Sequence, residues 1–443
     1  MTSQEFLHLI MLRVKTDSPS ERAALLLLFA DYQDAFATQL SDIQCPSLLP
    51  EFSIPTISDD PSILSAKYRK KYPEAERAVI EDTTMKWLAN NIVEPCLHPN
   101  PIINSLLTVP KADGSYRVCL DGQPVNKVTP LDTTFTPDLR EILERMVGAN
   151  VISVFDLFSG YLQVSLRPED RHKLAFSTRL GCFQPTRMFF GSKNACAAFC
   201  LGILKMEIDS DLSAFLAAYF DDLTIHSGTF DDHVAHLRKF LSAIIKNRLK
   251  INLPKSIVAA KEVKALGYLV SADGIQPTPE FIEAVLRMQT PSTRSEVKTL
   301  LGFVGHYRQF IPNFADLTAP LCGLTVDGPK KFIWEESHEQ AFSAIKLVLT
   351  SRPVMALPLL GSPFMFYSDA SGTAIAGVVT QIQPITATQL VEVEKPIAYF
   401  SRRLTAAEKN YTITELELLA IVFLVDKCRN WIVGRETTVV TDH

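Results

Sequence analysis

The sequence lacks the patterns that mark zinc-binding, disulfide-rich or membrane proteins. Its eight cysteines are scattered over 443 residues without a CxxC pair, so neither a zinc site nor a disulfide framework is indicated. The longest apolar run near the start, LLLLFA at Leu25–Ala30, is far too short to cross a bilayer. No charged segment followed by an apolar core and a cleavage site opens the chain, so we expect an intracellular, cytoplasmic protein with no membrane partner.

The chain also has little excess charge of either sign. Its formal net charge is −5, whereas a protein that binds nucleic acid with its whole surface is usually basic. The distribution is uneven, because residues 233–310 carry 12 Lys and Arg against 5 Asp and Glu. Such a segment can follow a phosphate backbone, although a solvated helical face explains the same charges. The length allows about two to four domains.

Hydrophobic periodicity predicts helices and strands mixed along the whole chain. We expect helices at 75–95, 194–209, 231–249 and 415–433. We expect hairpins at 105–121, 215–227 and 265–275, and further strands at 151–156, 363–370, 375–381, 395–401 and 437–443. On the helix at 231–249, His233 and His236 form an HxxH pair. No further ligand stands at metal spacing, so we expect a solvated helix face there and a structural role for His226.

Two adjacent aspartates, Asp221 and Asp222, interrupt the apolar run AYFDDLTIHS. A hairpin turn is the ordinary interpretation of such a pair. A third aspartate, Asp156, ends the strand VISVFD. If that strand lies beside the hairpin, three carboxylates converge, raise one another's pKa and favour a bound pair of divalent metal ions. Successive strand residues point to opposite faces, so we expect Asp221 to be the more direct ligand.

A second group of carboxylates lies near the end of the chain. Asp369 ends the strand PFMFYSD, Glu417 lies in the helix ELELLAIV, and Asp442 ends the strand TTVVTD. Two strand ends and a helix can bring such side chains to one metal site of the hydrolytic type. Glu415 lies two residues before Glu417, about 200° around the helix, so only one of the two can face the site.

The order of four segments carries a resemblance to a known family. FDLFSGY, MFFGSKNACAAF, YFDDL and ALGYLVSADGI together resemble the palm of a reverse transcriptase, most of all that of the gypsy-type LTR-retrotransposon polymerases. Tyr219-Phe220-Asp221-Asp222 matches the aromatic–x–Asp–Asp box of the family. The segments YSDAS, PIAYFSRRL, NYTITELELLAI and TDH resemble the ribonuclease H domain that follows the polymerase, whose Glu-Leu-x-Ala frame selects Glu417.

The resemblance implies a role for individual residues. Tyr161 matches the aromatic steric gate that disfavours a 2′-hydroxyl, with a core tyrosine as the alternative, and Lys111 and Arg117 match residues that grip the triphosphate. Gly191 lies where the backbone approaches the nucleotide. The full assignment is metal binding and catalysis by Asp156, Asp221, Asp222, Asp369, Glu417 and Asp442, substrate binding by Lys111, Arg117, Tyr161, Gly191 and Tyr219, and a primer grip at Leu266, Gly267 and Tyr268.

The resemblance also implies the fold and the activity. We expect a multi-domain α+β fold, a right-hand polymerase with fingers, palm and thumb, followed by a connection and a partial ribonuclease H-like domain. The expected domains are an N-terminal extension at 1–60, fingers and palm at 61–275, thumb and connection at 276–360, and the ribonuclease H-like domain at 361–443. The expected activity is RNA-directed DNA polymerisation with two Mg²⁺. The partners would be an RNA template, a DNA primer, their RNA–DNA hybrid and dNTPs, in the cytoplasm or in a virus-like particle.

Some positions depart from the family pattern. Phe189 and Cys196 replace prolines, and Gly122-Gln123 replaces a Tyr-Arg pair on the template side. The chain stops one residue after Asp442, so we expect an incomplete ribonuclease H domain, a half-formed sheet and no ribonuclease H activity. These departures leave a second hypothesis, a catalytically inactive retroelement remnant that at most binds nucleic acid.

Overall fold

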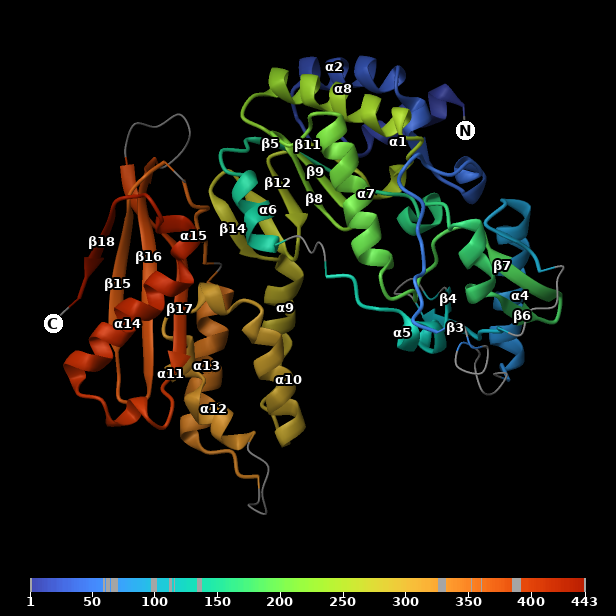
Figure 1. Ribbon diagram of the computed structural model, residues 1–443. Coiled ribbons are helices and arrows are strands. Elements are labelled where there is room, and N and C mark those ends of the chain that lie inside the picture. Colours follow the sequence, from blue (N-terminus) through green and yellow to red (C-terminus); the bar gives the residue numbers. More distant parts are fainter. Residues whose placement is uncertain are drawn as a thin grey trace. The chain divides into compact units, whose positions relative to one another are not determined.

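The computed structural model describes residues 2–441 except 59, 61–63, 65–70, 97–101, 111–113, 115, 134–137, 326–331, 352, 360 and 385–391. The chain divides into two compact units (Figure 1), Met1–Met146 with Asn150–Lys261 and Val147–Ala149 with Glu262–His443. Both units mix helices and strands, as predicted. None of the helices described is long and apolar enough to span a membrane. The predicted boundaries of the four domains stay predictions, because compact units need not coincide with functional domains.

The first unit is built on an antiparallel sheet of four strands in the order β11-β5-β9-β8. These strands are β5 (Val151–Asp156), β8 (Leu216–Tyr219), β9 (Asp222–Ser227) and β11 (Ile257–Ala260). The residues at 152–155 of β5 and 223–227 of β9 are all buried. Apolar and polar residues alternate in these segments, and the polar side chains of Ser153, Thr224, His226 and Ser227 are buried as well, which indicates that both faces of the sheet are covered.

Helices cover this sheet and extend the core. Helix α8 (Phe230–Lys246) packs on β9 and β5, α7 (Ala195–Asp209) packs on β8, and α2 (Pro19–Ala30) packs on α8. Helix α8 begins where the Thr229 side chain accepts a hydrogen bond from the backbone of Asp232, which is a typical N-cap. The other helices of the unit are α1 (Ser3–Met11), α4 (Glu74–Ala89), α5 (Gln123–Val128) and α6 (Leu139–Arg145), with 3₁₀ turns η1 (Gln33–Ala35), η2 (Leu40–Ile43), η3 (Gly160–Gln163), η4 (Pro168–Leu174) and η5 (Leu253–Lys255).

Smaller sheets complete the first unit. The strands β2, β7 and β6 form one sheet, β3 and β4 form a hairpin, and β1 pairs in parallel with β10. Helix α4 packs on β2, β3 and β4. The bounds are β1 (Phe36–Ala37), β2 (Val93–Pro95), β3 (Leu106–Pro110), β4 (Tyr116–Leu120), β6 (Phe176–Thr178), β7 (Gly181–Pro185) and β10 (Ile251–Asn252).

The second unit holds two further sheets and a group of helices. The sheet β12-β13-β14 is antiparallel, and in the sheet β17-β16-β15-β18 only the β15–β18 pair is parallel. The strands are β12 (Glu262–Ala265), β13 (Tyr268–Ser271), β14 (Gly274–Pro277), β15 (Phe364–Ala370), β16 (Ala374–Pro384), β17 (Glu392–Arg403) and β18 (Thr437–Val440). The helices are α9 (Pro279–Arg287), α10 (Arg294–Gly305), η6 (Arg308–Phe310), α11 (Phe314–Leu317), α12 (Ala319–Leu324), α13 (Glu336–Thr350), η7 (Glu408–Asn410), α14 (Ile413–Lys427) and α15 (Arg429–Ile432).

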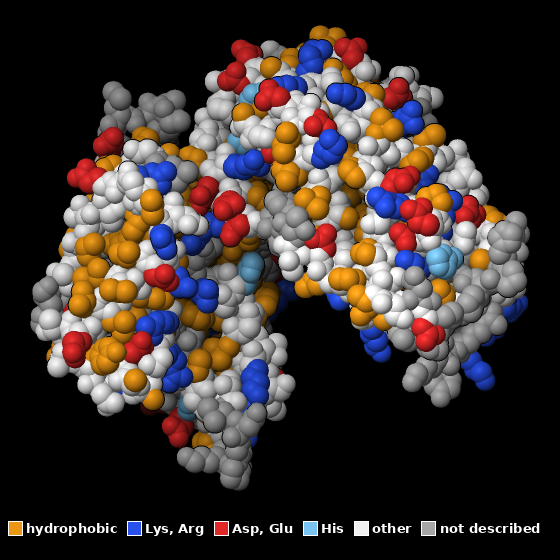
Figure 2. All heavy atoms as spheres, viewed as in Figure 1, with side chains coloured by type: hydrophobic (Ala, Val, Ile, Leu, Met, Phe, Trp, Pro, Cys, Tyr) orange, Lys and Arg blue, Asp and Glu red, His pale blue; other side chains and the backbone are white. Residues whose placement is uncertain are grey.

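One side of α14 carries apolar side chains that face solvent. Leu418, Val422 and Val425 are 60%, 56% and 39% exposed, and their spacing places them on one stripe of the helix. Val439 and Val440 of β18 are 38% and 39% exposed. Figure 2 shows apolar side chains gathered over this part of the second unit.

The predicted helix at 75–95 ends earlier than expected. Helix α4 stops at Ala89, Asn91 takes a left-handed φ of 57°, and β2 then begins at Val93. A left-handed residue cannot continue a right-handed helix, so the chain leaves the helix before Pro95 is reached. The helix predicted at 415–433 likewise divides, at Cys428, into α14 and α15.

Candidate active site

The adjacent aspartates lie at a two-residue turn between β8 and β9. Tyr219 pairs with Asp222 across the hairpin, which leaves Phe220 and Asp221 as the turn. Phe220 has a φ of 52°, a conformation that is rare for a bulky aromatic residue. Such backbone strain persists where the surrounding structure imposes it, often at functional sites. The turn interpretation and the catalytic interpretation are therefore compatible, because the turn lifts Asp221 out of the strand ladder.

Asp156 faces this turn from the neighbouring strand. Asp156 and Asp222 are register partners between β5 and β9, and directly opposed residues of an antiparallel pair have Cα atoms about 4.5–5.5 Å apart. The backbone N–H of Leu157 donates a hydrogen bond of 3.3 Å to the carbonyl oxygen of Asp221. The structure thus brings the three aspartates of the first predicted site to one end of the sheet.

The three carboxylates disfavour one another's charge. Burial raises the pKa of Asp221 to about 6, the carboxylates of Asp156 and Asp222 add to this, and the charges of Lys255 and Arg117 oppose it. Burial, and then Asp156, also raises the pKa of Asp222. Within the described part of the chain, the Oδ1 atom of Asp221 is buried and accepts no hydrogen bond. A buried carboxylate oxygen without a partner is costly, so a cation at this position would be strongly favoured.

Two residues that the sequence analysis missed contact Asp156. The Nζ atom of Lys255 lies 2.9 Å from Oδ2 of Asp156, and the Nδ2 atom of Asn252 donates a hydrogen bond of 3.2 Å to the same oxygen. Both belong to the segment of β10 and η5. The run INLPKS holds a lysine just after a short strand, and this lysine was the available sign of a charged partner. No local pattern places this turn beside a strand end almost one hundred residues earlier.

The donor set suits a hard divalent cation. Carboxylate oxygens are the ligands that Mg²⁺ prefers. The Oδ1 atom of Asp221 has no hydrogen-bond partner among the described residues. Among the residues that the structure describes, no group of three or more His, Cys, Asp or Glu side chains stands ready at metal-binding spacing. The Lys255 ammonium group supplies the positive charge beside the Asp156 carboxylate. The residues therefore fit a cation by their chemistry and by the orphaned oxygen of Asp221.

Tyr161 lies close to the three carboxylates. A Cβ atom on the preceding residue, Gly160, would stand 3.0 Å from Oδ1 of Asp221, so a glycine allows this approach. The Tyr161 ring packs on Phe199 with centroids 5.4 Å apart and on Phe190 at 4.9 Å. Burial, and then the neighbouring Cys196 thiol, raises the pKa of the Tyr161 hydroxyl, which stays neutral. Tyr161 is half-buried at the edge of the site and not enclosed in the core.

Arg117 extends from β4 towards the same region. Its guanidinium carbon lies 5.3 Å from the centroid of the Phe190 ring, and its charge lowers the pKa of Asp221. Gly191 has a φ of 104°, and a Cβ atom there would stand 2.2 Å from the carbonyl oxygen of Leu120. The close neighbour of Gly191 is thus the backbone of β4, which gives this glycine a structural reason besides the predicted approach of a nucleotide.

Two residues of the predicted nucleotide site remain, Tyr219 and Lys111. Tyr219 is partly exposed, and its ring packs edge-on against Phe220 with centroids 4.3 Å apart. Lys111 lies outside the described residues. The assignment of both to nucleotide binding stays a prediction.

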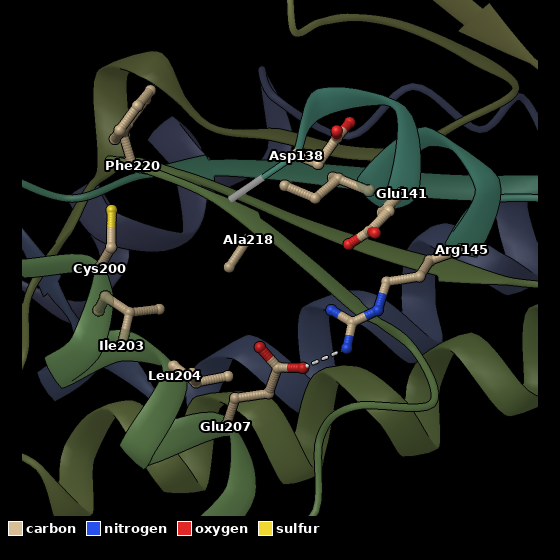
Figure 3. Close-up of a pocket in the computed structure, with 10 residues that line it drawn as sticks. Asp138, Glu141, Arg145, Cys200, Ile203, Leu204, Glu207, Ala218 and Phe220 are labelled. Atoms are coloured by element: carbon tan, nitrogen blue, oxygen red, sulfur yellow. Dashed lines mark hydrogen bonds and ion pairs between the residues drawn. The ribbon is translucent and has the colours of Figure 1, made fainter. Parts of the chain in front are cut away.

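A cavity of about 350 Å³ lies beside the turn at Phe220 and Asp221, between α6, α7 and β8. Figure 3 shows Arg145 and Glu207 among its lining side chains, joined by an ion pair of 2.9 Å. Arg145 also donates a hydrogen bond of 3.3 Å to the carbonyl oxygen of Leu216. The pair therefore ties α6 and α7 to β8, the strand that enters the catalytic turn. The cavity is lined by Asp138, Glu141, Ile142, Arg145, Cys200, Ile203, Leu204, Glu207, Ala218 and Phe220.

The expected solvated face of α8 is wrong at His233. This residue is fully buried, and its two ring nitrogens lie 2.7 Å from the Ser153 hydroxyl and 2.9 Å from the Ser227 hydroxyl. His236 bonds the same Ser227 hydroxyl at 2.8 Å. The buried residues of α8 are His233, Leu237, Phe240, Leu241, Ala243 and Ile244, so the helix turns its histidine-bearing face towards the sheet. The spacing of the apolar residues along this helix could have indicated that His233 is buried.

The buried histidines are neutral. Burial lowers the pKa of His226 to about 4 and that of His233 to about 3, and neighbouring imidazoles lower both further. His233 therefore bonds its two serine hydroxyls as an uncharged partner in the core behind β9, whereas the Nε2 atom of His226 is buried without a hydrogen-bond partner among the described residues. This agrees with the structural role predicted for His226.

The second predicted site lies in the second unit and is only partly described. Asp369 is exposed on β15, and Glu417 is 5% exposed on α14, which packs on β15. Glu415 instead caps its own helix, where its Oε2 atom accepts a hydrogen bond of 2.7 Å from the backbone of Thr412. The two glutamates thus have different surroundings, as predicted. Asp442 lies outside the described residues, so the convergence of the three carboxylates stays a prediction.

The predicted primer grip forms the turn between β12 and β13. Leu266 and Gly267 take left-handed φ values of 60° and 84°. The Tyr307 hydroxyl donates a hydrogen bond of 2.5 Å to the carbonyl oxygen of Gly267. Tyr268 is buried, and its ring stacks on His306 with centroids 5.4 Å apart. The turn is therefore held from inside the second unit, with Tyr268 as part of its support.

Comparison with known protein families gives two matches. Residues 109–270 match the reverse transcriptase (RNA-dependent DNA polymerase) family, and residues 334–439 match the RNase H-like domain found in reverse transcriptase.

Curated relatives are Pol polyproteins of transposons. The chain is 32% identical over 434 residues to the retrovirus-related Pol polyprotein from transposon opus of Drosophila melanogaster, covering 94% of this chain and 42% of the relative. It is 30% identical over 385 residues to the polyprotein from transposon 297 of the same organism, covering 85% and 35%. The transposon Tf2-3 polyprotein of Schizosaccharomyces pombe is 30% identical over 343 residues, covering 76% and 25%. The chain thus spans less than half the length of these relatives.

Solved structures show the same fold. A foamy viral protease-reverse transcriptase in complex with double-stranded DNA has a TM-score of 0.87 at 22% identity, covering 100% of this chain and 75% of that one. The same enzyme in complex with an RNA/DNA hybrid has a TM-score of 0.82 at 21% identity, covering 100% and 58%. This likeness confirms the predicted fold class, a multi-domain α+β polymerase fold.

Proposed function

Because this chain belongs to the gypsy-type family of retrotransposon Pol proteins with a reverse transcriptase domain, we propose that it is an RNA-directed DNA polymerase. It would transfer nucleotides from dNTPs to the 3′-hydroxyl of a DNA primer paired with an RNA template. The observation that carries the proposal is the placement of Asp156 opposite Asp222, with Asp221 raised on the turn beside them.

Reverse transcriptases generally use divalent metal ions, and the proposal here is a pair of Mg²⁺. When bound, such a pair activates the attacking hydroxyl and neutralises the leaving pyrophosphate. Asp156, Asp221 and Asp222 would hold it. With the pKa of Asp221 raised to about 6, a proton competes with the cation for this carboxylate at mildly acidic pH.

The residues around the carboxylates would position the nucleotide. Arg117 presents a planar, permanently charged group that can bond two phosphate oxygens at once. Lys111 would act on the same phosphates as a point charge. Tyr161 follows Gly160, where an added Cβ atom would stand 3.0 Å from Oδ1 of Asp221, so a sugar above the carboxylates would lie against the Tyr161 ring. That position suits the exclusion of a 2′-hydroxyl.

The proposed partners are an RNA template, a DNA primer, the RNA–DNA hybrid and dNTPs. The excess of Lys and Arg at 233–310 would follow the phosphate backbone of the duplex. The proposed location is the cytoplasm or a virus-like particle within it.

The decisive experiment is primer extension on an RNA template with dNTPs and Mg²⁺, comparing the chain with Asp221→Asn. Asp211→Asn is the matched control, because the Asp211 side chain is 92% exposed and bonds only the surface residue Lys239 among the described contacts. Extension by the wild type and the control, lost in Asp221→Asn, supports the proposal. A folded, monodisperse wild-type chain without extension would instead support the inactive remnant.

A further inference from the structure

Two cysteines lie one helical turn apart at the start of α7, and we name them the α7 dithiol. Cys196 is the second residue of this helix and is partly buried, whereas Cys200 is 5% exposed. Side chains four residues apart on a helix are neighbours, with Cβ atoms about 5–6 Å apart. The two thiols share a hydrogen bond, and both are free of disulfides. Because the family pattern has proline at the position of Cys196, that pattern lacks this pair.

The helix face that carries the α7 dithiol lies against the first predicted site. Phe199, on the same face, packs on the Tyr161 ring with centroids 5.4 Å apart. The Tyr161 hydroxyl shares a hydrogen bond with the Cys196 thiol, and the Cys200 sulfur accepts a hydrogen bond from the backbone of Phe220. The dithiol therefore contacts the proposed sugar gate through one sulfur and the turn between β8 and β9 through the other.

The cavity of about 350 Å³ between α6, α7 and β8 adjoins the α7 dithiol, because Cys200 belongs to its lining. Figure 3 shows the Cys200 sulfur directed towards Phe220 at the edge of this space. Ile203, Leu204 and Phe220 make part of the lining apolar. An apolar cavity of about 150 Å³ is enough to bind benzene, so there is room for a ring-sized substituent beside the Cys200 sulfur.

A bridging atom suits the α7 dithiol better than a disulfide does. A disulfide needs Cβ atoms about 3.5–4.5 Å apart, which is closer than the spacing of about 5–6 Å on an intact helix. One atom bound to both sulfurs lengthens the link, and thiolates select soft, thiophilic partners. Among the described residues, no group of three or more His, Cys, Asp or Glu side chains could hold a metal ion. The dithiol therefore favours a centre that is satisfied by two thiolates.

We propose that Cys196 and Cys200 form a binding site for organic trivalent arsenicals, thiophilic centres that take two thiolates and carry an apolar substituent. In the binding step an arsenous oxide, R–As=O, forms two As–S bonds. The two thiol protons leave with its oxygen as water, so the step needs no oxidant or reductant. The substituent R would occupy the cavity beside Cys200.

Occupancy of this site would inhibit nucleotide incorporation. The arsenic would take the Cys196 sulfur from its hydrogen bond with Tyr161 and would place a substituent beside Phe220 of the turn. Small displacements near reacting groups are costly, because the reaction depends on their orientation. The binding site stands on its own geometry, whereas its effect on incorporation rests on the proposed polymerase function.

A second pair of cysteines in the same unit is the matched control, and we name it the cross-strand pair. Cys96 follows β2 and Cys182 lies on β7, two strands that pair with each other. The backbone N–H of Cys96 donates a hydrogen bond of 2.9 Å to the carbonyl oxygen of Cys182. Both residues are partly exposed, so the cross-strand pair is accessible to the same reagent but lies outside the lining of the cavity.

Trypsin separates the two pairs. Both thiols of the α7 dithiol fall in the peptide 194–205, which holds no other cysteine. The cross-strand pair is divided between the peptides 87–111 and 180–187. An arsenic bound to the α7 dithiol therefore adds mass to one peptide, whereas an arsenic bound to the cross-strand pair joins two.

The test treats the folded chain with one equivalent of phenylarsine oxide in excess glutathione and maps the adduct by tryptic digestion and mass spectrometry. We expect one phenylarsenic group on peptide 194–205, retained against the monothiol glutathione and released by 2,3-dimercaptopropanol. Cys196→Ala and Cys200→Ala should each lose the adduct, and the double variant Cys96→Ala/Cys182→Ala should keep it.

Two results would overturn the site. One is an adduct that joins peptides 87–111 and 180–187 in place of the expected one, and the other is the absence of any adduct that withstands glutathione. If Cys200→Ala does not fold, Cys196→Ala decides alone, because Cys196 is only partly buried.

Primer extension tests the consequence separately. Phenylarsine oxide should lower the extension rate of the wild type and of Cys96→Ala/Cys182→Ala at least about tenfold, and that of Cys196→Ala and Cys200→Ala by less than about twofold. Equal inhibition of all four proteins would contradict an effect through the α7 dithiol. Failure of the polymerase proposal would appear as absent extension by the untreated wild type, and the mass measurement would still decide whether the site exists.

Discussion

The two carboxylate sites of this chain are built in different ways. In the first unit, Asp156 and Asp222 are register partners on adjacent strands, and Asp221 lies on the two-residue turn between β8 and β9. In the second unit, Asp369 is exposed at the end of a strand while Glu417 is 5% exposed on a helix. The first site is set by hydrogen-bond register, whereas the second depends on how a helix packs on a sheet. Register is a tighter constraint than packing, because a slip by one residue would turn every side chain to the opposite face.

The difference also concerns charge. The carboxylates of the first site are buried and repel one another, which raises the pKa of Asp221 to about 6 although the charge of Lys255 opposes the shift. Groups whose burial and charged neighbours shift their pKa in this way are frequent at functional sites. We therefore expect substitutions in the first unit to dominate the activity of the chain.

The largest effect expected is the loss of an aspartate of the first site. Asp221→Asn and Asp156→Asn should each lower the rate of primer extension on the order of a thousandfold, because several kcal/mol of charge stabilisation are lost. Asp369→Asn should leave the same rate within about twofold. The rates are measured under single-turnover conditions with Mg²⁺. A comparable loss in Asp369→Asn would abolish the distinction between the two sites.

The next effect concerns two glycines with opposite surroundings. Gly191→Ala should lower the free energy of unfolding by about 2–4 kcal/mol, because the residue has a left-handed φ and its Cβ would meet the Leu120 carbonyl at 2.2 Å. Gly302→Ala, within α10 and with nothing outside its own helix within 4 Å of the added Cβ, should raise it by about 0.5–1 kcal/mol. Chemical denaturation followed by circular dichroism measures both. Equal effects would show that the nucleotide-side backbone is no more constrained than a helix surface.

The buried histidines should make the first unit sensitive to acid. Their folded pKa values, about 4 for His226 and about 3 for His233, lie below the usual 6.5. The unfolded chain therefore binds more protons between these limits. The stabilisation is complete above pH 6.5 and decreases as the pH falls towards 4 and 3, by at least about 2 kcal/mol between pH 7 and pH 4.

A substitution isolates the contribution of the histidines from that of other groups. His233→Gln keeps a hydrogen-bonding side chain between the two serines but cannot be protonated. Its free energy of unfolding, measured by urea denaturation from pH 4 to pH 7, should depend less steeply on pH than that of the wild type. Identical slopes would mean that His233 does not carry the acid sensitivity.

The smallest effect expected is a displacement of the pH profile. Primer extension at limiting Mg²⁺ should fall as the pH drops through about 6, where Asp221 takes up a proton. Lys255→Met removes a charge that lowers the pKa of Asp221 and Asp222, so the acid limb should move to higher pH. Lys239→Met, which removes an exposed lysine bonded to Asp211, is the control. An unmoved acid limb in Lys255→Met would show that Asp221 does not set it.

Much of the first site could be predicted from the sequence. The apolar runs on both sides of Asp221 and Asp222 predicted two strands and a turn, and VISVFD predicted a third strand, whose position beside the hairpin was a condition that the pairing of β5 with β9 meets. The residues that the prediction missed, Lys255 and Asn252, reach Asp156 from a segment almost one hundred residues away. The pairing of β11 with β5 and the bridge between Leu157 and Ile251 bring that segment to the site.

In the second unit the elements could be predicted from the sequence, but the point where one helix divides could not. The alternation of strands and helices from 363 onward was readable, and the helix geometry separated Glu415 from Glu417. The division of the predicted helix at Cys428 into α14 and α15 could not be predicted from the sequence, because the apolar pattern continues across that point. Packing against the sheet, rather than local propensity, decides where such a helix ends.

The sequence by itself determined the family, the strand–turn–strand that carries the aspartate pair, and the order of the motifs along the chain, because these depend on neighbouring residues. The tertiary structure alone decided which lysine balances Asp156, why His233 is buried, and that Phe190 joins Arg117 to Tyr161. Those facts depend on contacts between segments far apart in the chain. Hydrophobic patterning specifies which residues are buried, whereas the pairing and packing of strands and helices specify which of them meet.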